Sequence, residues 1–122
     1  MKTLFILLFS FMLLFADEKL ESLYKSNEYA KACEYGAGIW RKNEKDEKFM
    51  LLFGNSCTKS DYIDYLAVPA ARLGKTKESR EAAALYSTLL TKKKLLLMAL
   101  VDGADISSLS LPQVPHILSV AF

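Results

Sequence analysis

Residues 49–62 read Phe-Met-Leu-Leu-Phe-Gly-Asn-Ser-Cys-Thr-Lys-Ser-Asp-Tyr, and this stretch decides how the chain folds. Its apolar side chains recur at the spacing of one helix face, namely Phe49, Leu52, Phe53 and Cys57. Ser60 and Asp61 follow, and both residue types commonly cap the start of a helix. The stretch therefore predicts that a helix over 44–59 ends at a short turn and that a second helix follows.

The end of this stretch has counterparts 34 residues earlier and 33 residues later. Cys57-Thr58-Lys59-Ser60 corresponds to Leu23-Tyr24-Lys25-Ser26 and to Leu90-Thr91-Lys92-Lys93. Each segment lies where a helix is expected to end. A period of 33–34 residues with two helices per unit is typical of helical repeat proteins. The chain has room for two and a half to three such units.

The remaining segments also predict helices, because Gly and Pro are scarce before Gly103 and no segment alternates like a strand. The expected helices are 17–26, 28–42 capped by Asn27, 62–73 stopped by Gly74, 77–91 capped by Thr76, and a short helix from Lys92 or Lys93 to Val101. Pro69 must kink or shorten the helix over 62–73. Gly36 and Gly38 indicate a close helix crossing within 28–42.

Two of these segments resemble the tetratricopeptide repeat. Residues 27–35, Asn-Glu-Tyr-Ala-Lys-Ala-Cys-Glu-Tyr, resemble its turn and second helix, and residues 51–57 resemble its first helix with Gly54 at the small position. The chain departs from the family at Tyr65 and Ser87, where small residues are usual, and lacks the proline that ends a repeat. The resemblance implies an all-α fold of helix hairpins stacked as a short right-handed superhelix. A Sel1-type repeat is also compatible, and a compact non-repeat bundle is the alternative.

The N-terminus has the layout of a secretory signal peptide. Lys2 precedes an apolar run that ends at the small residue Ala16, and 13 of the first 16 residues are apolar. The run is shorter than the roughly 20 residues that a membrane-spanning helix needs. We expect cleavage after Ala16, which leaves a helical domain over 17–103 and a tail over 104–122. A retained anchor is the alternative. The expected location is a bacterial periplasm, or the medium if the protein is secreted.

Export changes the interpretation of the two cysteines, Cys33 and Cys57. In an oxidising compartment, two cysteines in a protein of this size favour a disulfide, and two buried thiols are the alternative. If 28–42 and 45–59 form an antiparallel hairpin, the two cysteines lie within about 5 Å of the same level along the helices at 1.5 Å rise per residue. We therefore expect a Cys33–Cys57 bridge.

The family resemblance also implies a binding face. In tetratricopeptide proteins the first helix of each unit lines a concave groove that binds peptide segments. With Gly54 as the register mark, the implied lining is Lys48, Leu51, Asn55, Thr58 and Lys59, together with Asp17, Glu21, Tyr24, Lys25, Glu81, Ala84, Thr88, Thr91 and Lys92. Lys25, Lys59 and Lys92 would form a column suited to an acidic segment or a terminal carboxylate. Alternatively, each lysine is solvated and complements a helix dipole.

Other functions are disfavoured. Ser56-Cys57-Thr58-Lys59 matches the Ser-x-x-Lys motif of penicillin-binding enzymes, but the match recurs at Ser22 with the repeat period and the chain is far shorter than that fold. His116, the sole histidine, has no second metal ligand nearby. The near balance of 16 basic against 14 acidic residues argues against nucleic-acid binding. We expect no enzyme activity, metal, cofactor or small-molecule ligand, and we interpret Lys92-Lys93-Lys94 as a helix junction rather than a lipid contact.

The tail has a different composition, with Pro112 and Pro115 bracketing a turn and a short helix expected over His116–Ala121. A repeat array needs its last hydrophobic face covered, so we expect the tail to fold back as a cap. The sequence thus predicts a non-catalytic periplasmic module that binds a protein or peptide of the cell envelope through its concave face. The alternative is a small accessory or structural subunit of an envelope complex that docks through the apolar tail.

Overall fold

A computed structural model describes residues 18–115, and in this range every regular element is helical. A helical segment over 18–25 precedes the remaining elements, which are α2 (Tyr29–Ile39), the 3-10 turn η1 (Trp40–Asn43), α3 (Glu47–Lys59), the 3-10 turn η2 (Ile63–Leu66), α4 (Ala67–Arg72) and α5 (Lys77–Asp102). The predicted signal segment and the predicted helix His116–Ala121 lie outside the described residues. The all-α prediction is confirmed for the part of the chain that is described.

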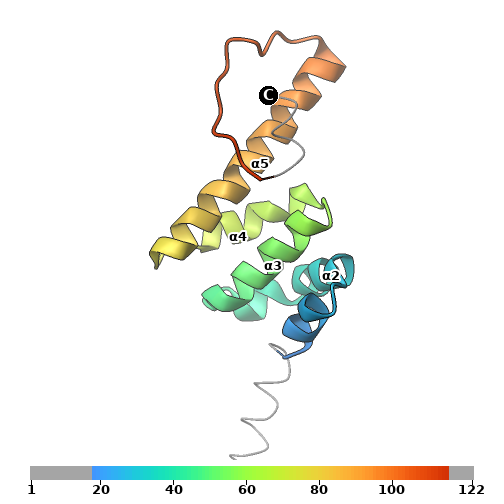
Figure 1. Cartoon of the computed structure of the whole chain (residues 1–122), viewed down its shortest axis with the longest axis vertical. Helices are drawn as coiled ribbons and strands as arrows, with labels where there is room; N and C mark the ends of the chain where they lie inside the picture. The colour runs from blue at the N-terminus through green and yellow to red at the C-terminus, as the bar shows by residue number, and fades with distance from the viewer. Residues whose placement is uncertain (1–17, 116–122) are drawn as a thin grey trace, which may run out of the picture.

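Helices that follow one another in the chain pack against each other (Figure 1). The disulfide Cys33–Cys57 joins α2 to the end of α3. Gly36, three residues further along α2, packs against Phe53, four residues earlier in α3, so these two helices run antiparallel. Helix α4 packs in turn against α3 and α5. The core consists mainly of apolar side chains that are less than one-tenth exposed: Leu20, Ala32, Cys33, Phe49, Met50, Phe53, Cys57, Ile63, Leu66, Leu73, Tyr86 and Leu89.

The same turn occurs twice, 34 residues apart. Asn27 and Asp61 both have a positive φ of 62°. The next backbone N–H, of Glu28 or of Tyr62, donates to a carbonyl five residues back, on Leu23 or on Cys57, at 3.0 and 2.9 Å. This left-handed turn is a common way to satisfy the carbonyls at a helix end, and Asn and Asp tolerate it better than most residues. The predicted cap at Asn27 is therefore corrected, because this residue forms the turn and Glu28 holds the cap position.

The third expected turn is absent. We predicted separate helices over 77–91 and from Lys92 or Lys93 to Val101, but α5 is continuous from Lys77 to Asp102. The residue corresponding to Asn27 and Asp61 is Lys94, which has no side chain suited to a left-handed turn. Leu, Lys, Met and Ala are also good helix formers. The helix ends as predicted at Gly103, which has φ 65°.

Other helix limits shift by a few residues. Helix 28–42 ends at Ile39 and continues as η1. The predicted helix 44–59 begins at Glu47, because the Asp46 carboxylate accepts a hydrogen bond from the Phe49 backbone N–H at 3.2 Å. The predicted helix 62–73 splits into η2 and α4. Pro69 lies in the first turn of α4, where a proline removes no helix hydrogen bond.

The described part of the tail turns back beside α5 (Figure 1), and Val114 packs against the core. Helix α5 itself runs past the other helices, so its last turns have only the tail beside them in this view. No helix in the range 18–115 has both the length and the apolar character needed to cross a membrane.

Candidate functional site

The first helices of the predicted units lie next to one another. The segment 18–25 contacts α3 through Glu21 and Lys48, whose carboxylate and ammonium groups are 3.9 Å apart. Helix α3 contacts α5 through Asn55, whose Oδ1 accepts a hydrogen bond from the Tyr86 hydroxyl at 2.6 Å. We call the surface formed by Glu21 and Tyr24 of the segment 18–25 and by Lys48, Asn55 and Lys59 of α3, which α5 borders through Tyr86, the three-helix face.

Lys59 is the most distinctive member of this face. Its ammonium nitrogen lies 5.5 Å from the centre of the Tyr24 ring and 4.8 Å from that of Tyr29. The two rings meet edge to face at 5.4 Å. The nearby Tyr24 hydroxyl, followed by a hydrogen bond with Tyr29, raises the pKa of Lys59. The side chain is exposed at the surface, so a fixed positive charge is presented beside two aromatic rings.

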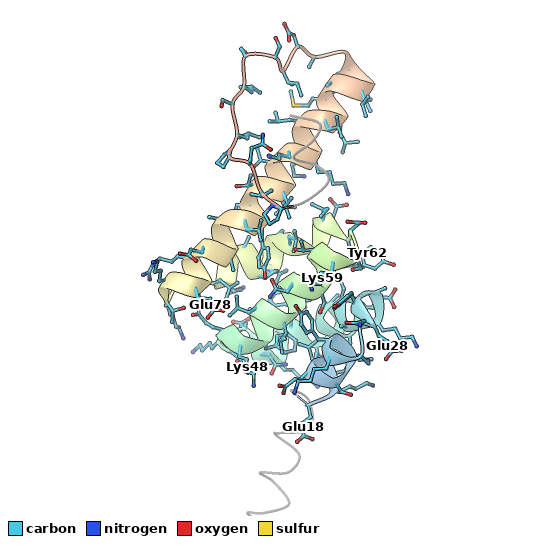
Figure 2. The ribbon with its side chains drawn as sticks, viewed as in Figure 1. Glu18, Glu28, Lys48, Lys59, Tyr62 and Glu78 are labelled. Atoms are coloured by element: carbon cyan, nitrogen blue, oxygen red, sulfur yellow. A yellow bond between two sulfur atoms is a disulfide. The ribbon has the colours of Figure 1, made fainter. Side chains whose placement is uncertain are left out.

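Glu21 lies between two further lysines. Its carboxylate is 3.2 Å from the ammonium of Lys25 and 3.9 Å from that of Lys48. Both lysine side chains are largely exposed, at 74% and 70%. The salt bridges are therefore weak in free energy, and an incoming carboxylate can compete for both cations. Lys48 and Lys59 lie at opposite ends of α3 (Figure 2).

Asn55 is held by Tyr86. The Tyr86 hydroxyl also lies 3.3 Å from the Leu51 carbonyl, and burial raises the pKa of Tyr86, so the hydroxyl remains a donor. Because the tyrosine uses Asn55 Oδ1, the amide N–H groups of Asn55 remain as donors, and no hydrogen bond from them is found within residues 18–115. Asn55 is half-buried, and an amide donor fixed in this way suits a peptide carbonyl or carboxylate.

Lys92 does not join Lys25 and Lys59 at the surface. It is fully buried, so the prediction of an exposed three-lysine column is wrong. The cause is the continuity of α5, which turns position 92 toward the interior instead of ending a helix there. Thr88 is half-buried, and its hydroxyl donates to the Ala84 carbonyl of its own helix at 2.7 Å. Leu51 is half-buried beside the core.

The Ser-x-x-Lys match has no catalytic geometry. Ser56 is fully buried, and its hydroxyl donates to the Leu52 carbonyl at 2.7 Å. Lys59 instead lies over the two tyrosine rings. The motif therefore reflects a helix that keeps a small polar residue inside and a lysine outside.

Sequence reasoning missed the contributions of Tyr86 and Tyr29. Gly54 was a signal for the first, because a glycine in the middle of an amphipathic helix indicates a bulky neighbour. A Cβ at position 54 would overlap the Tyr86 ring. The predicted Cys33–Cys57 bridge was a signal for Tyr29, because Tyr29 lies one helical turn before Cys33 and Lys59 lies two residues after Cys57.

Comparison of the chain with family models, with curated proteins and with solved structures finds no match.

Proposed function

We propose that this protein is an exported, tetratricopeptide-like interaction module that binds an extended peptide segment of an envelope protein on the three-helix face. The observation that carries the proposal is the combination of Lys59 and Asn55 on one helix. Lys59 offers a fixed cation beside two rings, and Asn55 offers oriented amide donors. Together they suit a segment with a carboxylate and free backbone carbonyls.

The repeat architecture is supported by two features. The left-handed turns at Asn27 and Asp61 are equivalent in backbone geometry and spacing. Helices α3 and α5 also run in the same direction, because Glu47 near the start of α3 contacts Ser79 near the start of α5, and Asn55 further along α3 contacts Tyr86 further along α5. The paired residues are 32 and 31 positions apart in the sequence. Parallel first helices with α4 between them in the chain are what a stack of hairpins requires.

The periplasmic location is supported by the disulfide. Cys33 and Cys57 are bonded, and stable disulfides form in oxidising compartments such as the periplasm. A signal segment ending at Ala16 is consistent with this location.

Site-specific photo-cross-linking in living cells tests the proposal. A photoreactive residue replaces Lys48 on the three-helix face, or Lys31 on α2 as a control of equal exposure. We expect a discrete adduct from position 48 and none from position 31. A third variant replaces Leu109, which is an exposed residue of the tail. An adduct from position 109 alone would overturn the proposal and favour docking through the tail.

A further inference from the structure

The last two turns of α5 carry an unbroken apolar run, Leu95-Leu96-Leu97-Met98-Ala99-Leu100-Val101. Seven consecutive apolar residues point to every side of a helix. A helix that is hydrophobic all round is normally covered all round. Here only one side is covered, because Leu95, Leu96 and Ala99 are half-buried while four neighbours are exposed.

The exposed side chains are large. Leu97 and Met98 are 49% and 47% exposed, and Leu100 and Val101 are 74% and 76% exposed. Leu97, Met98 and Val101 follow one another at helical spacing and form one strip, which we call the distal α5 strip. Contiguous apolar surface of this kind on a small protein marks an interaction site.

The strip continues into a groove between α4 and α5. This groove has a volume of about 400 Å³ and is lined by Ala67, Ala70, Ala71, Ser87, Leu90, Thr91 and Lys94. The three alanines keep its α4 wall low, so a second helix can approach α5 closely beside Lys94. The groove therefore leaves room beside Lys94 for the end of a second helix that packs on the strip.

The charges at the two ends of the strip indicate which helix covers it. Lys94 precedes the apolar run and Asp102 ends it, and both side chains are exposed. Neither residue has an ion-pair partner among residues 18–115. If two copies of α5 pack antiparallel about Met98, Lys94 of each copy lies opposite Asp102 of the other. The surface is thus complementary in charge to itself, as an interface with two-fold symmetry requires.

We propose that two copies of this chain associate through the distal α5 strip, with their α5 helices antiparallel about a two-fold axis at Met98. The strip covers about one and a half helical turns, so the dimer is at the small end of known interfaces and its affinity is modest. A lipid surface fits less well, because the strip ends in one cation and one anion instead of a set of cations.

Sedimentation equilibrium of the full chain tests the dimer and its charge pairing. Between about 1 and about 200 µM, the range in which a small interface associates, the wild type is expected to pass from monomer to dimer. Lys94→Glu and Asp102→Lys are each expected to weaken association at least about tenfold, because the two-fold axis repeats every like-charge contact. Lys77→Glu, at the opposite end of α5, is the control and is expected to dimerise normally.

Mixing the two charge variants gives the decisive result. Each variant alone is monomeric, but a mixture of Lys94→Glu and Asp102→Lys pairs unlike charges at both ends and is expected to form a heterodimer with affinity near that of the wild type. A wild-type chain that stays monomeric at every concentration would overturn the proposal. The surface would then belong to another protein or to residues 116–122. A mixture that stays monomeric would overturn the antiparallel pairing.

A cysteine on the axis provides a second readout. The native cysteines are bonded to each other, so Met98→Cys introduces a single free thiol. We expect it to form a covalent dimer on mild oxidation at least about tenfold faster than Leu109→Cys, an equally exposed control, because effective concentration rises at a shared axis. Equal rates for the two variants would contradict the proposed axis.

Discussion

Gly54 and Tyr86 set the separation of α3 and α5. The Tyr86 ring occupies the space where a side chain at position 54 would lie, and its hydroxyl reaches Asn55 one residue further along. One tyrosine thus fills the core and orients a residue of the three-helix face. Gly38 is also within a helix but has open space around its Cα.

Gly54 and Gly38 are expected to respond in opposite directions to alanine. Gly54→Ala forces the Tyr86 ring to move and is expected to lower the free energy of unfolding by about 1–3 kcal/mol, as overpacked cores do. Gly38→Ala meets no atom within 4 Å and is expected to raise it by up to about 1 kcal/mol through helix propensity. Urea denaturation of both variants measures the change. A neutral or stabilising Gly54→Ala would contradict the packing described.

Glu47 fixes the turn that precedes α5. Its carboxylate accepts hydrogen bonds from the Ser79 hydroxyl at 2.6 Å and from the backbone N–H groups of Gly74 and Lys75 at 2.9 and 3.2 Å. The Ser79 bond, followed by the two backbone bonds, holds the pKa of Glu47 below its ordinary value of 4.5. The charged form is therefore the one that stabilises the fold.

This shift predicts how stability depends on pH. A carboxylate with a lowered folded pKa contributes stability above its unfolded pKa of about 4.5 and loses that contribution as the pH falls through the folded value. At pH 7 we expect Glu47→Gln to melt at a lower temperature than the wild type. The difference in Tm between the two proteins should narrow as the pH falls below about 4. Thermal melts from pH 7 to pH 3 measure it, and a difference that stays constant would exclude this role for the carboxylate.

At the level of the helices, the sequence predicted which segments are helical better than it predicted the residues at which each helix begins and ends. Asp61 followed a run of helical periodicity, so the turn after α3 was accessible from the pattern. The loss of the third turn was not, because Lys92 and Lys93 occupy the register of the earlier turns and only Lys94, in place of Asn or Asp, indicates that the helix continues. A period in the sequence therefore located the units but did not determine how the last one folds.

The positions of the candidate site residues were also predictable only in part. The register from Gly54 placed Lys48, Asn55 and Lys59 on one helix face. In the structure Lys48 and Lys59 lie beside the segment 18–25, and Asn55 lies beside α5. The prediction that Lys92 is exposed was wrong, because α5 continues through this position and packs it into the interior. The rings under Lys59 come from two different helices across a turn, a proximity that periodicity does not encode.

The disulfide is the covalent link between α2 and α3, and it closes a loop of 24 residues. Replacing both cysteines with alanine is expected to lower the free energy of unfolding by about 3 kcal/mol in the chain-entropy treatment. Both sulfur-bearing side chains are fully buried, so reductant should act on the folded protein slowly. Urea denaturation measures the free energy of unfolding of the wild type and of the Cys33→Ala/Cys57→Ala variant. Equal values would show that the bridge does not stabilise the fold.

At the level of the whole molecule, we propose export, because a disulfide and a partner in the cell envelope both suit an oxidising compartment. The intact mass of the protein recovered from a periplasmic fraction is expected to correspond to a chain beginning at Asp17. A protein that retains Met1–Ala16, or that is confined to the cytoplasm with free thiols, would contradict the proposed location.

The central claim is that the three-helix face binds a partner, and Lys59→Glu tests it most directly. Quantitative mass spectrometry of proteins captured from an envelope extract should show one partner enriched by the wild type. Its recovery with Lys59→Glu should fall at least about tenfold, as expected when an interface cation is replaced by an anion. Lys31→Glu, an exposed lysine of α2, should capture it normally. Equal recovery by wild type and Lys59→Glu, with both proteins folded, would contradict the account.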